Sequence, residues 1–201
     1  MKTIFACLLC LSLCMPAFSL AQGGKEKKVE IALGYEVQQE REQATKEQLN
    51  RVLQEYDLSK WIFTEKVLVD YYTSIPHSHP ILTLNTRYVD DDERLLSTFV
   101  HEQIHWFTNS KPDGVDKTVA EFKTLYPEVP VGKGQGARDE FSTYLHLIVC
   151  YLEFSAVTEL LGEPKAREIM AGWRHYKWIY KTVLNEGNKL KAVIEKNKLT
   201  I

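Results

Sequence analysis

The spacing of apolar residues predicts helices over most of the chain. Residues 36–56 contain no helix-breaking residue and place their apolar side chains on one face, with charges on the other. Residues 138–161 are largely apolar and stop at Gly162, a residue suited to a helix C-cap. Similar patterns predict a short helix over 114–125, a helix over 164–180 and a final short helix over 189–196.

Two segments in the first half of the chain have the composition of strands. Residues 61–72 are rich in Val, Ile, Phe and Tyr, and residues 80–88 alternate apolar and polar groups around Thr83. Prolines fix a turn between them, and residues 126–136 combine prolines and glycines in a predicted loop. With no repeat or domain boundary, the pattern predicts one mainly helical α+β domain with a small sheet near residues 61–88.

Residues 1–21 are typical of a secretory signal peptide. Lys2 supplies a positive start, residues 4–14 form an apolar run too short to span a bilayer, and residues 19–21 fit a cleavage site. We therefore expect cleavage after Ala21 and an exported domain of residues 22–201, periplasmic or secreted. The signal peptide contains three of the four cysteines. After its cleavage Cys150 has no internal disulfide partner, and it is expected to be buried and inert.

Charge and hydropathy argue against binding to nucleic acid and against a membrane-spanning segment. The formal net charge is −2, and no basic patch suggests binding to nucleic acid. After the signal peptide we identify no apolar run long enough to cross a membrane, so we expect no membrane span in the exported chain.

The chain carries one motif with specific chemistry, His101-Glu102-Gln103-Ile104-His105. On a helix, residues i and i+4 share a face, so His101 and His105 can bind one Zn²⁺ with Zn–N distances of about 2.0–2.1 Å. Glu102 lies beside them, where a carboxylate can deprotonate a zinc-bound water and pass the proton to a leaving amine. The acidic run 90–93 supplies capping and helix-dipole stabilisation for the start of this helix.

The flanks of the motif extend this pattern. Thr98 stands three residues before the first histidine, and the apolar Trp106 and Phe107 follow the second. Residues 95–107 therefore resemble the active-site helix of the zincin metallopeptidases, a likeness that covers about a dozen residues. It implies a zincin-like fold, one zinc ion per chain and a peptide or protein substrate. Thr108 and Lys111 occupy the positions of the metzincin Gly and His, which excludes that class.

Catalytic zinc has three protein ligands, so a third is expected after the motif. His146 and Glu153 lie two turns apart on one face of an apolar helix, where an unpaired carboxylate or imidazole would be costly. The later-helix glutamate of gluzincins places Glu153 ahead of His146, although the gluzincin E-x-x-x-D pattern is absent. Of His146 and Glu153, the residue that does not bind zinc could orient one of the zinc ligands. Glu140 is a third candidate for the remaining ligand. Alternatively, the two form a buried pair unrelated to metal.

The zincin resemblance also implies a donor for the oxyanion, commonly a His or Tyr side chain. His175 is the first candidate, with Tyr176, Tyr180 and Tyr144 as others; alternatively, the aromatic residues 173–180 pack on the core. His77 and His79 form either a second metal pair or a polar loop. If residues 80–85 form an edge strand above the motif helix, as in zincins, a peptide could bind along it.

The sequence thus predicts an exported zinc metallopeptidase, with Glu102 and His175 as catalytic residues and His101, His105, and Glu153 or His146 as metal ligands. A second hypothesis is a non-catalytic exported module that binds metal or a partner on the same scaffold. In a third, the motif is accidental and the protein is a helical structural domain.

Overall fold

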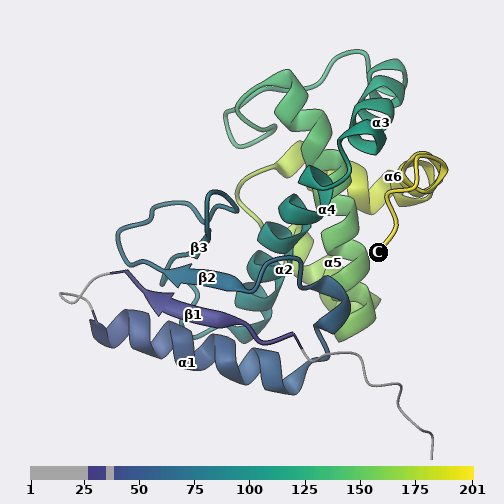
Figure 1. Cartoon of the computed structure of the whole chain (residues 1–201). Helices are drawn as coiled ribbons and strands as arrows, with labels where there is room; N and C mark the ends of the chain where they lie inside the picture. The colour runs from purple at the N-terminus through teal and green to yellow at the C-terminus, as the bar shows by residue number, and fades with distance from the viewer. Residues whose placement is uncertain (1–26, 35–38) are drawn as a thin grey trace, which may run out of the picture.

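The computed structural model describes residues 27–34 and 39–201 (Figure 1). The expected signal peptide lies outside these residues, as does the start of the helix expected from residue 36. Within the described residues the chain forms six α-helices and one small parallel sheet. The α+β class expected from the sequence is confirmed.

The sheet has the strand order β1-β2-β3 and is parallel throughout. Its strands are β1 (Glu30–Leu33), β2 (Lys66–Val69) and β3 (Leu82–Leu84). The α1 helix (Gln39–Glu55) connects β1 to β2 and packs against both. The two expected strands are shorter than predicted because Trp61 belongs to a 3-10 turn (Ser59–Trp61) and prolines limit the segment before β3. The sequence pattern did not reveal β1.

The outer edge of β3 is paired within the chain. Thr83 donates its backbone N–H to the carbonyl of His77 at 2.7 Å and accepts from the His77 N–H at 3.0 Å. On its other side, β3 pairs with β2. The expectation that residues 80–85 leave an open edge for a peptide is therefore wrong, because the preceding loop covers that edge at Thr83.

Five helices follow the sheet: α2 (Asp92–Asn109), α3 (Pro112–Leu125), α4 (Glu140–Leu161), α5 (Glu163–Ala171) and α6 (Lys177–Lys196). The Asp91 carboxylate accepts from Arg94 N at the start of α2, and Asp139 does the same for Ser142 N at the start of α4. Both are side-chain N-caps that satisfy otherwise unpaired donors. The motif helix thus begins at the acidic run, as the sequence predicted.

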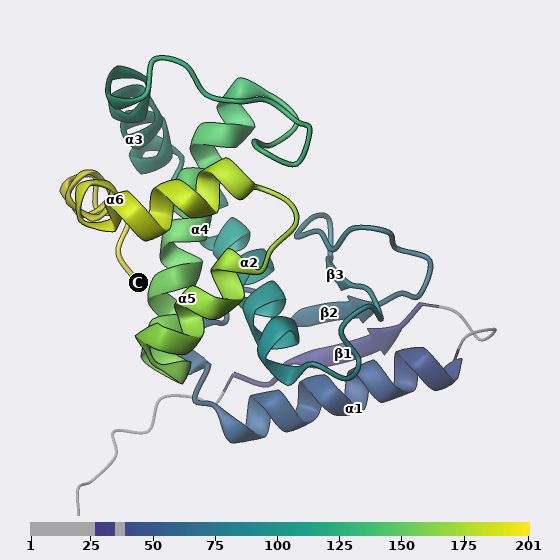
Figure 2. The ribbon, with the colours of Figure 1, turned by 180° about the vertical axis from the view of Figure 1, so that it is seen from behind.

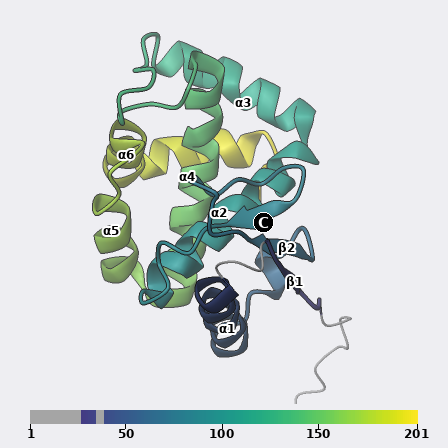
Figure 3. The same ribbon diagram turned by 90° about the vertical axis from the view of Figure 1, so that its left-hand side faces the viewer.

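The central element is α4, which contacts α2, α3, α5 and α6. The sheet and α1 lie at one end of the molecule and α3 at the other (Figures 1 and 3). By length and composition α4 could cross a membrane, which corrects the expectation that no such run follows the leader. Its buried side chains and its packing on four helices are those of a core helix in this fold.

The helix expected over residues 164–180 is interrupted. The first part, α5, ends at Ala171, where the Gly172 N–H caps its last carbonyls. Trp173 then packs into the core, and Tyr176 has a left-handed backbone with φ 53° before α6 begins at Lys177. The second part, α6, runs to Lys196 but is kinked at Glu186, whose backbone is non-helical (φ −122°, ψ 21°). The segment after this kink corresponds to the separate final helix expected over 189–196. Figure 2 shows the α5–α6 connection as a loop beside α2.

Candidate metal centre

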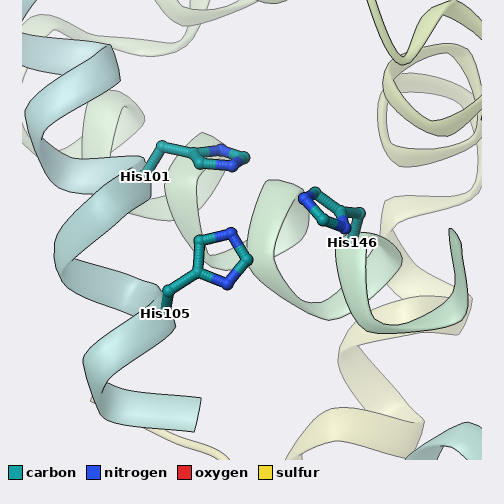
Figure 4. Close-up of side chains that lie close together, drawn as sticks. All are labelled: His101, His105 and His146. Atoms are coloured by element: carbon teal, nitrogen blue, oxygen red, sulfur yellow. The ribbon is translucent and has the colours of Figure 1, made fainter. Parts of the chain in front are cut away.

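Three histidines from two helices converge in the structure. His101 and His105 extend from one face of α2, and His146 faces them from α4 (Figure 4). Their ring centroids are 5.1 Å (101–105), 5.0 Å (105–146) and 5.7 Å (101–146) apart. One nitrogen of each ring lies within 4.8 Å of the others. This spacing allows the three imidazoles to bind one metal ion after small side-chain adjustments.

Hydrogen bonds fix which nitrogen two of these rings present. His146 Nδ1 lies 2.6 Å from the Ser142 carbonyl oxygen, which only accepts, so Nδ1 carries the proton. His101 Nδ1 lies 2.8 Å from Glu153 Oε2, and it donates in the same way to that carboxylate. Nε2 of each ring is then left as the metal-binding atom. Such an anchor on the other ring nitrogen is typical of metal-binding histidines, so the donor set fits zinc.

Glu153 is held behind His101. Besides the imidazole, it accepts from Ser97 Oγ at 2.5 Å and from the Tyr180 hydroxyl at 2.9 Å. It also forms a second close group with His101 and Cys150, but all three of these residues are buried. Because its oxygens are engaged by three donors, the geometry favours His146 over Glu153 as the third ligand. That is the reverse of the order expected from the resemblance.

The other acidic candidate is remote from both groups. Glu140 is exposed at the start of α4, where its carboxylate lies 3.4 Å from Lys123 Nζ. His77 and His79 also lie outside both groups. The imidazole of His79 instead stacks on Trp106 at 4.3 Å, and His77 holds the outer edge of β3.

Replacing Glu153 by Gln is expected to lower zinc affinity about 10- to 100-fold, because a neutral amide orients and polarises His101 less strongly than a carboxylate. A competition titration against a chromophoric chelator measures the change. Glu159→Gln, an exposed position on the same helix, is the matched control and should leave affinity unchanged. Unchanged affinity in Glu153→Gln would show that this contact has no part in metal binding.

Burial sets the charges in the centre. It raises the pKa of Glu102 to about 7, with a further increase from Glu153 and an opposing effect of His101. It lowers the pKa of His146 to about 3, with a contribution from His101, and lowers the pKa of His105 well below its usual value. These two imidazoles are therefore neutral at pH 7, the form that binds metal. Burial also lowers the pKa of His101, but the negative Glu153 carboxylate outweighs it and the net shift is upward.

A pocket of about 430 Å³ opens beside the histidines. His101, Glu102 and Glu153 form part of its wall, and residues of the α5–α6 connection form another part. Its size suits a small ligand or a few residues of a peptide. The structure therefore places the motif glutamate at a cavity rather than in the sealed core.

Two of the proposed oxyanion donors line this pocket from the α5–α6 connection. The Tyr176 ring lies 4.4 Å from His146 and 6.3 Å from His101, whereas His175 packs on Trp173 and Tyr176. Tyr180 donates its hydroxyl to Glu153. Tyr144 donates its hydroxyl to the Tyr126 carbonyl at 2.6 Å. The geometry thus favours Tyr176 over the first candidate, His175.

The loop over residues 130–137 holds Tyr176 in place. Carbonyls of Gly134 and Gln135 accept from the first N–H groups of α6, Lys177 N at 2.9 Å and Trp178 N at 3.1 Å. These contacts satisfy donors that have no partner within a helix. Gly136 is essential to this shape, because a Cβ there would lie 1.7 Å from the Pro130 carbonyl oxygen.

Gly136→Ala is expected to lower the free energy of unfolding by about 1–3 kcal/mol, because the added methyl forces the loop backbone to move. Gly187→Ala is the control, since a Cβ at that position meets nothing within 4 Å. Because the added methyl has open space, this variant should be about as stable as the wild type. Urea unfolding compares the two, and equal stability would mean that the loop adapts at no cost.

Some pocket residues had no distinguishing signal in the sequence. Arg87 and Arg174 line the same cavity, but nothing local separates them from other surface arginines. Ser97, which donates to Glu153, is one turn before His101 and became identifiable only once α4 was seen to pack on α2.

No protein-family model, curated protein or solved structure matches the chain. The interpretation of the centre therefore depends on its own geometry.

Proposed function

We propose that this chain is an exported zinc-dependent hydrolase, most simply a metallopeptidase with a zincin-like fold. The observation that carries the proposal is the convergence of His101, His105 and His146 beside a pocket whose wall includes His101 and Glu102. Three imidazole donors beside a carboxylate in the pocket wall are the arrangement that zinc hydrolysis requires.

Each residue has a distinct task in this proposal. His101, His105 and His146 would hold the ion, and Glu153 would keep His101 in the binding tautomer. Zinc, when bound, supplies a Lewis acid that polarises the scissile carbonyl and acidifies water. Glu102 accepts the proton of the attacking water and returns it to the leaving amine. Tyr176 donates its hydroxyl towards the carbonyl oxygen as negative charge develops there.

The alternative is a non-catalytic module that holds metal for structural reasons. Structural zinc sites are closed by four protein ligands. In the part of the chain that the structure describes, the three-histidine group contains no fourth His, Cys, Asp or Glu. The adjoining pocket offers room for water and substrate, so the arrangement favours catalysis.

Elemental analysis of the purified protein tests the proposal first. We expect one zinc per wild-type chain and none in His146→Ala, which removes one of the three donors. His77→Ala is the matched control, because this exposed histidine lies outside the group, and it should retain zinc. A wild-type protein that takes up no zinc on incubation would refute the proposed function.

A further inference from the structure

Two arginines in the wall of the pocket have no acidic partner. Arg87 follows β3, Arg174 lies in the α5–α6 connection, and both line the cavity that contains His101 and Glu102. Neither forms a salt bridge with any described residue, whereas nearby Arg94 pairs with Asp91 at 3.3 Å.

Arg87 is nevertheless held in position. Its Nη2 donates to the Ser74 carbonyl at 2.8 Å, which leaves its other N–H groups available. The residue is also close enough to His175 to disfavour a positive charge on that imidazole. The two pocket carboxylates do not neutralise these arginines: Glu153 is occupied by His101, Ser97 and Tyr180, and Glu102 lies beside the proposed metal ligands.

The remaining wall is mostly apolar. Ile75, Pro76, Tyr88 and Trp173 line the same cavity, and Ile75 is 72% exposed. A ligand that fits this pocket would therefore combine an apolar part with an anionic group for the arginines. Guanidinium groups bind carboxylates through paired, charge-assisted hydrogen bonds.

We propose that the pocket selects peptides that carry a carboxylate close to the bond to be cleaved, bound by Arg87 and Arg174. The inference rests on the proposed hydrolase function and specifies its substrate class. The carboxylate could be the C-terminal group of a peptide or the side chain of an Asp or Glu residue. Both present the same group to the arginines, and the test separates them.

Binding of four hydroxamates to the zinc-loaded protein tests the proposal without requiring turnover. A malonyl monohydroxamate, which ligates zinc, is coupled to leucine, leucinamide, glutamic acid α-amide or glutamine α-amide, and dissociation constants are measured by calorimetry. We expect the carboxylate member of at least one pair to bind about tenfold more tightly than its neutral partner. Preference for leucine over leucinamide indicates a C-terminal carboxylate, and preference for the glutamic acid probe over its glutamine counterpart indicates an acidic side chain.

Arginine variants assign the preference to the pocket. In the double variant Arg87→Gln, Arg174→Gln, the carboxylate and neutral probes should bind within about twofold of each other. Arg167→Gln, which alters an arginine that pairs with Glu163 outside this pocket, should keep the preference. Equal binding of all four probes to the wild type, or a preference that survives loss of both arginines, overturns the proposal. Failure of even the neutral probes to bind would instead count against the zinc site itself.

Discussion

Glu102→Gln is expected to lower peptide turnover about 100- to 10,000-fold while zinc content stays at the wild-type value. The amide has nearly the shape of the carboxylate but cannot accept the proton of the attacking water. Because Glu102 is not one of the three donors that converge, the metal should remain. A quenched-fluorescence peptide library provides the activity measurement, and elemental analysis on the same sample provides the zinc content.

Glu140→Gln is the matched control for this experiment. It makes the same chemical change at an exposed carboxylate near Lys123 and should affect neither turnover nor zinc. Wild-type turnover by Glu102→Gln would rule out Glu102 as the base. Loss of zinc from that variant would indicate that the carboxylate takes part in binding the ion.

The second large effect concerns stability. Zinc at a free concentration about 1,000 times its dissociation constant should add about 4 kcal/mol to the free energy of unfolding, provided that the unfolded chain does not bind it. For a domain of this size, that corresponds to a rise in Tm of roughly 8–16 °C. Thermal unfolding followed by circular dichroism, with zinc and with a chelator, measures the shift.

His101→Ala shows whether the stabilisation comes from this site. The variant lacks the histidine shared by both groups of possible ligands, so zinc should leave its Tm unchanged. An equal rise in the wild type and the variant would place the stabilising ion elsewhere. If zinc does not raise the wild-type Tm at all, the centre does not bind zinc tightly enough to matter for the fold.

The motif helix could be predicted in detail because its signals are local. The acidic run supplies the cap at Asp91, and the pairing of His101 with His105 follows from helix geometry alone. The choice between His146 and Glu153 could not be made in this way. They are separated by roughly 10 Å along α4, and only the packing of α4 on α2 places His146 opposite His105 and Glu153 behind His101.

The remaining differences also come from contacts between distant segments. Residues 173–180 have spacing compatible with a helix, but the carbonyls of Gly134 and Gln135 define a new helix start after Tyr176. The four-residue strand β1 has no strong pattern of its own and exists through pairing with β2. Arg87 and Arg174 meet at one cavity although they belong to opposite halves of the chain.

His105 on α2 and His146 on α4 stand at the two ends of the chain segment that contains α3. A metal ion bound by both would therefore close a loop in the chain. An ion shared by His105 and His146 would act as a cross-link in the folded state around α3 and the loop that supports Tyr176, and so hold α2 and α4 together at the ends of this segment. Separation of α2 from α4 at the histidines would then require release of the ion, and motions of the enclosed segment that depend on this separation would be suppressed while the ion is bound. Hydrogen exchange of α3 would therefore report metal occupancy, although no residue of that helix belongs to the centre.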